Sequence, residues 1–162
     1  MDLVYGMRQR NSQWKYHSHG ATFVALMPII DLPPPTMKIL SQSADETVYK
    51  LPEKSRCYTK EWDVFTLDTC LHEDGEKLVF IAKVPDNAWL SIGFGRSMTN
   101  TDMIAWRVVE GQGFTEDYWS TSHATPVLDD TQDLTDVSEL TSFEDGVMTF
   151  VTERALDTGD ES

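Results

Sequence analysis

The chain has 162 residues, 40% of them hydrophobic, which is enough material for one domain with a buried core. Its formal net charge is −14, from 27 acidic and 13 basic residues. We expect no nucleic acid partner, because this surface would repel the phosphates. We also expect no direct membrane insertion, since no stretch approaches the roughly 20 apolar residues of a membrane-spanning helix.

Short apolar and β-branched runs separated by turn residues dominate the chain, and helical periodicity is hard to find. The runs predict strands, in chain order, at residues 2–6, 22–27, 78–84, 89–95, 103–109, 113–121 and 147–154. Many short strands at a spacing of roughly 8–12 residues predict an all-β fold, an antiparallel β-sandwich or barrel. Residues 126–136 are predicted to form an acidic loop.

Residues 30–43 interrupt the strand pattern. Pro33, Pro34 and Pro35 cannot donate to a β-ladder and favour an extended polyproline conformation. We therefore predict three parts: strands in 1–32, a proline-rich linker in 33–46, and strands in 47–162. The first part is too short to fold alone and must pack on something.

The two cysteines, Cys57 and Cys70, leave the compartment open. In an oxidising compartment they could close a short loop, whereas in the cytosol they would be free thiols. No C-x-x-C pair occurs, so a structural zinc site is not expected. The first 20 residues lack the leading apolar core of a signal peptide, so we expect either a cytosolic protein or a piece of a longer chain.

One group of motifs follows a fixed order in the second half of the chain. It comprises a tryptophan, a Gly-Phe pair, a methionine before an aspartate, an aromatic pair and a "P..D..QD" loop: Trp89, Gly93, Phe94, Met98, Asp102, Tyr118, Trp119, Pro126, Asp129, Gln132 and Asp133. A later "F.R.L.TGD" is carried by Phe150, Arg154, Leu156, Gly159 and Asp160. In this order the motifs resemble the DOMON domain family, including the cytochrome domain of cellobiose dehydrogenase and the DOMON domain of dopamine beta-monooxygenase. The resemblance implies an immunoglobulin-like or jelly-roll-like sandwich.

The resemblance also implies that the order of the strands is changed. The family normally continues after "TGD" with a strand ending like "LVYG" and a closing "YH..G" strand. Here "LVYG" stands at residues 3–6 and "YHSHG" at 16–20. Residues 1–32 therefore resemble the late strands of a DOMON unit, and 47–162 the early and central strands. Either the chain is circularly permuted, or it was cut from a tandem array.

Some members of this family hold haem b between a methionine and a histidine, and the matching residues here are Met98 and His17. A thioether and an imidazole on opposite faces of the iron favour the ferrous state and suit electron transfer. His19 lies two residues on, and residues i and i+2 of a strand share a face, so it would line the pocket. Apolar walls are expected from Phe94, Met103 and Trp106.

Four alternatives stay open. The runner-up is a non-haem extracellular interaction module that binds carbohydrate or protein within a larger multidomain or tandem-repeat surface protein. A third possibility is an accessory domain of a copper monooxygenase. His17 and His19 could bind copper or zinc with a third ligand such as Met98, His72 or His123. Calcium could be held by carboxylates of the acidic loop, namely Asp129, Asp130 and Asp133.

The resemblance also implies a location and partners. We expect an extracellular, cell-surface or lumenal protein in which Cys57 and Cys70 are bridged. The expected partners are a redox partner domain or neighbouring DOMON units, with carbohydrate as a further possibility. No catalytic motif is recognisable, so we expect an electron-transfer or binding domain that is not itself catalytic.

Overall fold

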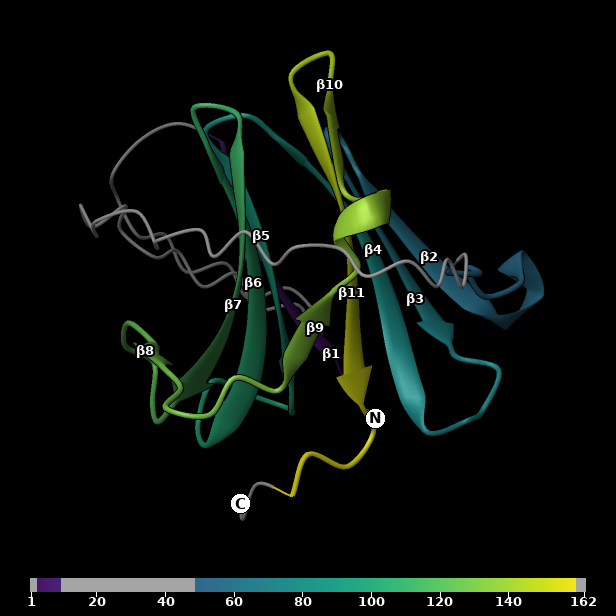
Figure 1. The fold of residues 1–162 in the computed structure, drawn as a ribbon. Coiled ribbons are helices and arrows are strands. Elements are labelled where there is room, and N and C mark those ends of the chain that lie inside the picture. The colour runs from purple at the N-terminus through teal and green to yellow at the C-terminus, as the bar shows by residue number, and fades with distance from the viewer. Residues whose placement is uncertain (1–2, 10–48, 160–162) are drawn as a thin grey trace.

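The computed structural model describes residues 3–9, as a backbone strand, and residues 49–159. Within these ranges the chain forms antiparallel β-strands and two short 3-10 turns, arranged as two sheets packed face to face (Figure 1). The predicted all-β sandwich is confirmed. In the part of the chain that is described, no helix is long and apolar enough to cross a membrane.

The first sheet, sheet A, has five strands in the order β1-β5-β6-β7-β8. Their bounds are β1 Leu3–Gln9, β5 Ala88–Phe94, β6 Thr101–Val109, β7 Gln112–Ser120 and β8 Val127–Leu128. β1 comes from the start of the chain and pairs with β5 along its whole length, from Leu3 opposite Phe94 to Gln9 opposite Ala88. The predicted division into 1–32, 33–46 and 47–162 stays a prediction, because residues 10–48 lie outside the described residues.

The second sheet, sheet B, has the strand order β10-β11-β4-β3-β2, and β9 also pairs with β11. The bounds are β2 Cys57–Trp62, β3 Phe65–Leu71, β4 Lys77–Pro85, β9 Leu134–Asp136, β10 Ser142–Glu144 and β11 Val147–Ala155, with 3-10 turns η1 Lys54–Arg56 and η2 Ser138–Leu140. The strands predicted at 78–84, 89–95, 103–109, 113–121 and 147–154 correspond to β4, β5, β6, β7 and β11.

The main core lies between the inner faces of the sheets. Alternate residues point inward because successive side chains of a strand face opposite sides. The core residues are Phe65, Leu67, Phe80, Ala82, Val84, Met148 and Phe150 from sheet B, and Ala88, Leu90, Ile92, Ile104, Trp106 and Val108 from sheet A. Trp106 is fully buried, with its ring 5.7 Å from that of Phe80. Its indole Nε1 donates to Thr152 Oγ1 at 3.0 Å, which satisfies the one polar atom of the side chain.

One ion pair crosses this core. Arg154 of β11 bonds through Nη2 to Asp102 Oδ2 of β6, so the pair joins the two sheets. The Arg154 side chain is only 5% exposed and that of Asp102 14%. The guanidinium also lies 4.4 Å from the centre of the Phe94 ring, so a cation–π contact adds to the pair.

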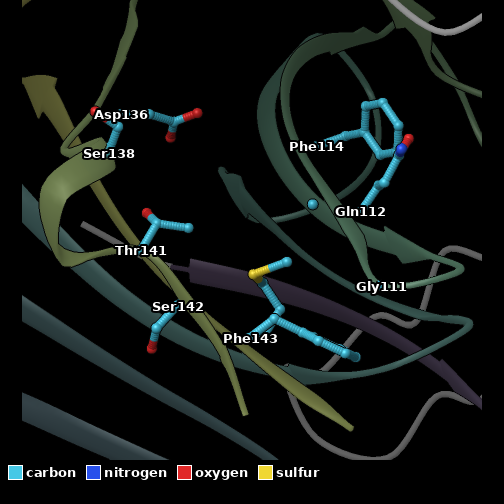
Figure 2. A pocket seen from close by; sticks show the side chains of 10 residues that line it. Gly111, Gln112, Phe114, Asp136, Ser138, Thr141, Ser142 and Phe143 are labelled. Carbon is cyan, nitrogen blue, oxygen red and sulfur yellow. The ribbon is translucent and has the colours of Figure 1, made fainter.

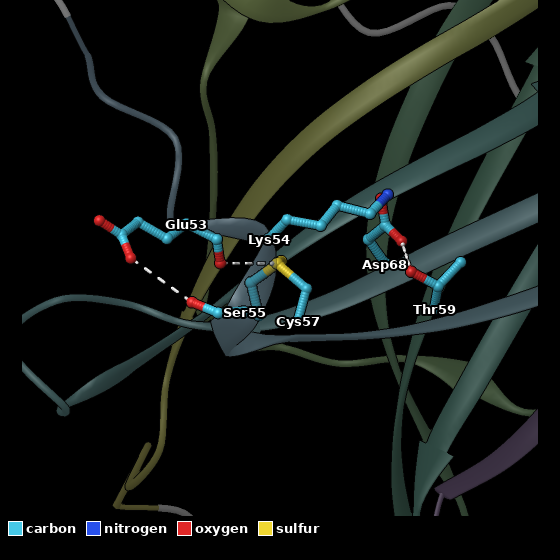
Figure 3. The surroundings of a disulfide bond; sticks show 7 residues. Glu53, Lys54, Ser55, Cys57, Thr59 and Asp68 are labelled. Atoms are coloured by element: carbon cyan, nitrogen blue, oxygen red, sulfur yellow. Dashed lines mark hydrogen bonds and ion pairs between the residues drawn. A yellow bond between two sulfur atoms is a disulfide. The ribbon is translucent and has the colours of Figure 1, made fainter.

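A smaller core covers the outer face of sheet B and includes the disulfide. Cys70 and Val79 pack with Val137 and Val151, and the partly buried Cys57 lies against them. Cys57 and Cys70 are opposite each other on β2 and β3, with Cα atoms 4.0 Å apart, and their sulfurs are bonded. The expected bridge is therefore confirmed. Figure 3 shows the bond beside turn η1, with the side chains of Thr59 and Asp68 nearby.

Removing the disulfide should destabilise the domain. The bridged cysteines are 13 positions apart, and closing such a loop in the unfolded chain corresponds to about 3 kcal/mol in the chain-entropy model. We expect the Cys57→Ser, Cys70→Ser double variant to lose about that much unfolding free energy in urea titrations. Reductant should lower the wild type to the same level and leave the variant unchanged. Equal midpoints for the oxidised wild type and the variant would contradict this expectation.

Candidate functional site

The outer face of sheet A carries buried side chains although it points away from sheet B. On β6, Met103 and Ala105 alternate with the core residues and are each 2% exposed. On β5, Trp89 and Ser91 face the same side and are 4% and 1% exposed. The outer face of sheet A therefore carries a second set of buried side chains in addition to the main core.

Met98 joins this surface from the turn between β5 and β6. It is 5% exposed and packs with Met103 and Tyr118. Its backbone is fixed, because the buried Ser120 hydroxyl donates to the Met98 carbonyl at 2.6 Å. Thr101 Oγ1 donates to the Ser97 carbonyl at 2.5 Å and holds the other side of the turn. The chain thus presents two thioethers side by side.

The middle of this surface is made of small residues. Gly93, Ser91 and Ala105 occupy neighbouring positions, with Ser91 paired to Ala105 and Gly93 to Met103. A Cβ at Gly93 would come within 3.0 Å of Thr101 Cγ2, so this position accepts no larger residue without a shift. Ser91 Oγ and Trp89 Nε1 are buried and have no hydrogen-bond partner among the described residues. Buried polar atoms without partners are rare and costly.

The polar side of the surface is held by an ion pair. Arg107 Nη2 lies 3.2 and 3.3 Å from the two carboxylate oxygens of Glu116, and the Tyr118 hydroxyl donates to the same carboxylate at 3.1 Å. Burial, and then the neighbouring Glu116 charge, raise the pKa of Tyr118 far above its usual value. Tyr118 therefore remains a neutral hydrogen-bond donor at any physiological pH.

The structure brings together only some of the residues predicted for the site. Met98 and Met103 are in contact. Phe94 and Trp106 pack into the core on the opposite, inner face of sheet A and do not lie beside Met98. His17 and His19 lie outside the described residues. The motifs include Trp89 and Tyr118 but do not assign them to the site, and Ser91, Arg107 and Glu116 were not predicted. Strand alternation relative to the core residues could have placed all five on this face.

The acidic loop between β7 and β9 is tied to β7. The Gln132 side-chain amide accepts from the Asp117 backbone N–H at 3.0 Å and donates to the Asp117 carbonyl at 3.1 Å, so it pairs with the strand as a neighbouring strand would. The Asp133 N–H donates to Asp117 Oδ2 at 3.3 Å, and the Asp129 N–H donates to the Asp117 carbonyl at 2.9 Å. The "P..D..QD" motif thus gives the loop its shape.

Metal sites were also predicted, and their candidate ligands are histidines and carboxylates. The part of the chain that the structure describes contains no group of three or more His, Cys, Asp or Glu side chains arranged to hold a metal ion. Among the histidines, His72 Nδ1 lies 2.8 Å from Asp74 Oδ2, on the turn between β3 and β4. His17 and His19, the pair predicted as an alternative to bind copper or zinc, lie outside the described residues.

Comparison with known families agrees with the fold and the motifs. The profile of the DOMON domain matches residues 63–162, which is more than half of the chain. No curated protein and no solved structure matches this chain. The Cys57–Cys70 bridge indicates an oxidising, secretory environment, which is typical of this family. The chain belongs to the DOMON domain family.

Proposed function

We propose that this domain binds haem b and transfers electrons, with Met98 and His17 as the two axial ligands of the iron. The observation that carries the proposal is the buried thioether of Met98 on the outer face of sheet A, beside Met103 and Tyr118. Some members of the DOMON family bind haem. The motif resemblance aligns Met98 with the methionine ligand of those members.

The residues of the surface fit such a group. A thioether is a suitable soft ligand for haem iron, and the buried Met98 and Met103 would contribute to an apolar environment that keeps water from a bound metal. Gly93, Ser91 and Ala105 leave the centre of the sheet face without bulky side chains. The unpartnered Ser91 Oγ and Trp89 Nε1 are polar atoms to which a bound group could supply a partner.

Assignment of both ligands to one sandwich is supported by β1. This strand ends at Gln9, a short way before His17, and pairs with β5 in the sheet that carries Met98. The pairing favours a circularly permuted unit over a piece of a tandem array. His17 would also need an acceptor for its second ring nitrogen, since metal-bound imidazoles are oriented by such a hydrogen bond.

Haem bound between a thioether and an imidazole would supply a one-electron couple with a raised potential. The residues of this chain would hold the group, exclude water and set its orientation. Ser120, by fixing the Met98 carbonyl, would position the thioether. We propose an extracellular or cell-surface location, with a redox partner domain or a neighbouring DOMON unit as the electron partner.

Replacing Met98 by leucine should remove the sulfur ligand while preserving volume. We expect haem-loaded wild type to show the absorption spectrum of a six-coordinate, low-spin haem, and Met98→Leu to show a high-spin spectrum. The matched control is Met148→Leu, which changes a buried methionine on the inner face of sheet B and should leave the spectrum unchanged. Volume-conserving swaps of this kind cost less than about 1.5 kcal/mol, so both variants should fold.

The histidines provide the second half of the test. His17→Ala should also abolish the six-coordinate spectrum, whereas His19→Ala should retain it. Purified protein that is colourless and gains no Soret band when haem is added would refute the proposal. That outcome would favour the runner-up, a non-haem extracellular module that binds carbohydrate or protein.

A further inference from the structure

A cavity of about 680 Å³ lies far along the sandwich from Met98, between the start of β7 and the segment that joins β9 to β10. One wall is formed by residues 111–114. The other wall includes Asp136, Ser138, Thr141 and Phe143, as Figure 2 shows. Cavities of this size are typical of sites for small organic molecules. The cavity is separate from the surface around Met98 that is proposed to bind haem. The two come nearest at Phe114, whose ring lies 4.7 Å from the guanidinium of Arg107.

Two glycines border the cavity. A Cβ at Gly113 would come within 2.7 Å of Phe150 Cε1 and 3.1 Å of Met148 Cε, so the absence of a side chain lets β7 pack closely on these two core residues. Gly111 has φ +75°, and a Cβ there would lie 3.3 Å from the Phe143 ring. Gly111 is also held in place, because its N–H donates to Asp86 Oδ1 at 2.9 Å.

The cavity is partly lined by apolar side chains. Phe143 is 42% exposed. Met148 is 7% exposed and borders the cavity from β11. An aromatic ring and a thioether that face a cavity together provide a surface for the hydrocarbon part of a ligand.

Among the described residues that line the cavity, the exposed Asp136 is the one charged residue. Its Oδ1 accepts from Thr152 Oγ1 at 3.0 Å, and Thr152 in turn accepts from the indole Nε1 of Trp106 at 3.0 Å. This chain of hydrogen bonds runs from the buried core to the cavity and fixes the carboxylate. Oδ2 has no hydrogen-bond partner among the described residues, and Figure 2 shows the carboxylate directed toward the wall of Gln112 and Phe114.

Charge decides which ligand fits. Among the described residues, the lining has one carboxylate and no lysine or arginine, and the chain has a net charge of −14, so an anion would be repelled. A cation would find an acceptor that is already oriented. We propose that this cavity binds a small organic ammonium ion, whose nitrogen donates to Asp136 Oδ2 and whose hydrocarbon part packs on Phe143 and Met148. This inference is independent of haem binding at Met98.

The hydrogen-bond chain provides the readout. A cation on Asp136 weakens the acceptor for Thr152 and should shift the indole N–H signal of Trp106 in a two-dimensional NMR spectrum. We expect benzylamine, which is protonated at pH 7, to give a saturable shift of this signal. Benzyl alcohol, which has nearly the same shape and no charge, should give none at the same concentrations. Equal binding of the two compounds would overturn the proposal.

Variants locate the site. Asp136→Asn keeps an oxygen for Thr152 but removes the charge, and we expect affinity for benzylamine to fall about tenfold, as for loss of a charge-assisted hydrogen bond. Asp130→Asn is the matched control, because it makes the same charge change at an exposed residue that does not line the cavity. If Asp136→Asn does not fold, Phe143→Ala should still weaken binding, since Phe143 is largely exposed. Unchanged affinity in the variant tested, or a saturable shift with glucose and none with benzylamine, would refute the ammonium site.

Discussion

Replacing Arg154 by methionine is expected to lower the free energy of unfolding by about 3–5 kcal/mol, as is usual when one partner of a buried ion pair is removed. The change leaves the buried Asp102 carboxylate without its cation, although methionine has a similar length. It also removes the guanidinium from the Phe94 ring. Urea titration followed by tryptophan fluorescence measures the loss.

Two further variants test the reason for this loss. If the uncompensated Asp102 carboxylate is the cause, then the double variant Arg154→Met, Asp102→Asn should be more stable than Arg154→Met alone. Lys50→Met breaks the exposed pair of Lys50 with Glu73, and it should cause no measurable change because exposed pairs contribute little. A double variant as unstable as the single one would show that packing of Arg154, and not charge, is what matters.

This pair illustrates what the sequence could and could not predict. Asp102 and Arg154 are both part of the family motifs. The sequence does not show that they form an ion pair, because they lie on strands of different sheets. The same holds for Gln132, whose side chain takes the place of a strand beside Asp117. The order of the motifs identified the family, but the structural role of each motif residue became clear only from its contacts in the folded domain.

The strands were predictable because their pattern is local. Apolar alternation located β4, β5, β6, β7 and β11 to within a few residues. The hairpin β2–β3 was not predicted. β2 is an edge strand that alternates exposed residues such as Tyr58 and Lys60 with partly buried ones, so its apolar signal is weak. β3 does bury Phe65 and Leu67 at alternate positions, so its alternation could have been recognised. The two short strands β8 and β9 lie at the ends of the predicted acidic loop, and strands of two or three residues give no periodic signal.

The candidate site was predicted only in part, and strand geometry explains why. Met103 and Trp106 are three residues apart on β6, so in a regular strand they must face opposite sides. Met103 contacts Met98 on the outer face, while Trp106 fills the core. Counting parity along the predicted strand would have separated them. The position of Met98 depends on Ser120 and Thr101, and such turn contacts have no sequence period.

Replacing Asp117 by asparagine is expected to stabilise the domain at pH 8 and to change little at pH 4. Asp117 is 2% exposed, and Oδ1 has no hydrogen-bond partner among the described residues. Burial raises the pKa of Asp117 to about 7; the Asp133 N–H opposes this shift, and the charges of Asp129 and Asp133 add to it. At pH 8 the native domain therefore has to hold a buried, poorly solvated charge.

The direction of the pH dependence follows from proton binding. Below the pKa of about 4 in the unfolded chain, both states hold the proton and Asp117 contributes no pH dependence. Between about pH 4 and 7 the native state holds a proton that the unfolded state has lost, so stability falls as pH rises through this range. A shift of about three pKa units corresponds to about 4 kcal/mol, the upper limit of the gain expected for Asp117→Asn at pH 8.

Urea titrations of the wild type and of Asp117→Asn at pH 4, 6 and 8 measure the difference in unfolding free energy. Asp130→Asn is the control, because it makes the same charge change at an exposed residue. If the two variants show the same pH-independent difference from the wild type, then the pKa of Asp117 is the same in the native and unfolded states, and the buried carboxyl does not titrate near pH 7.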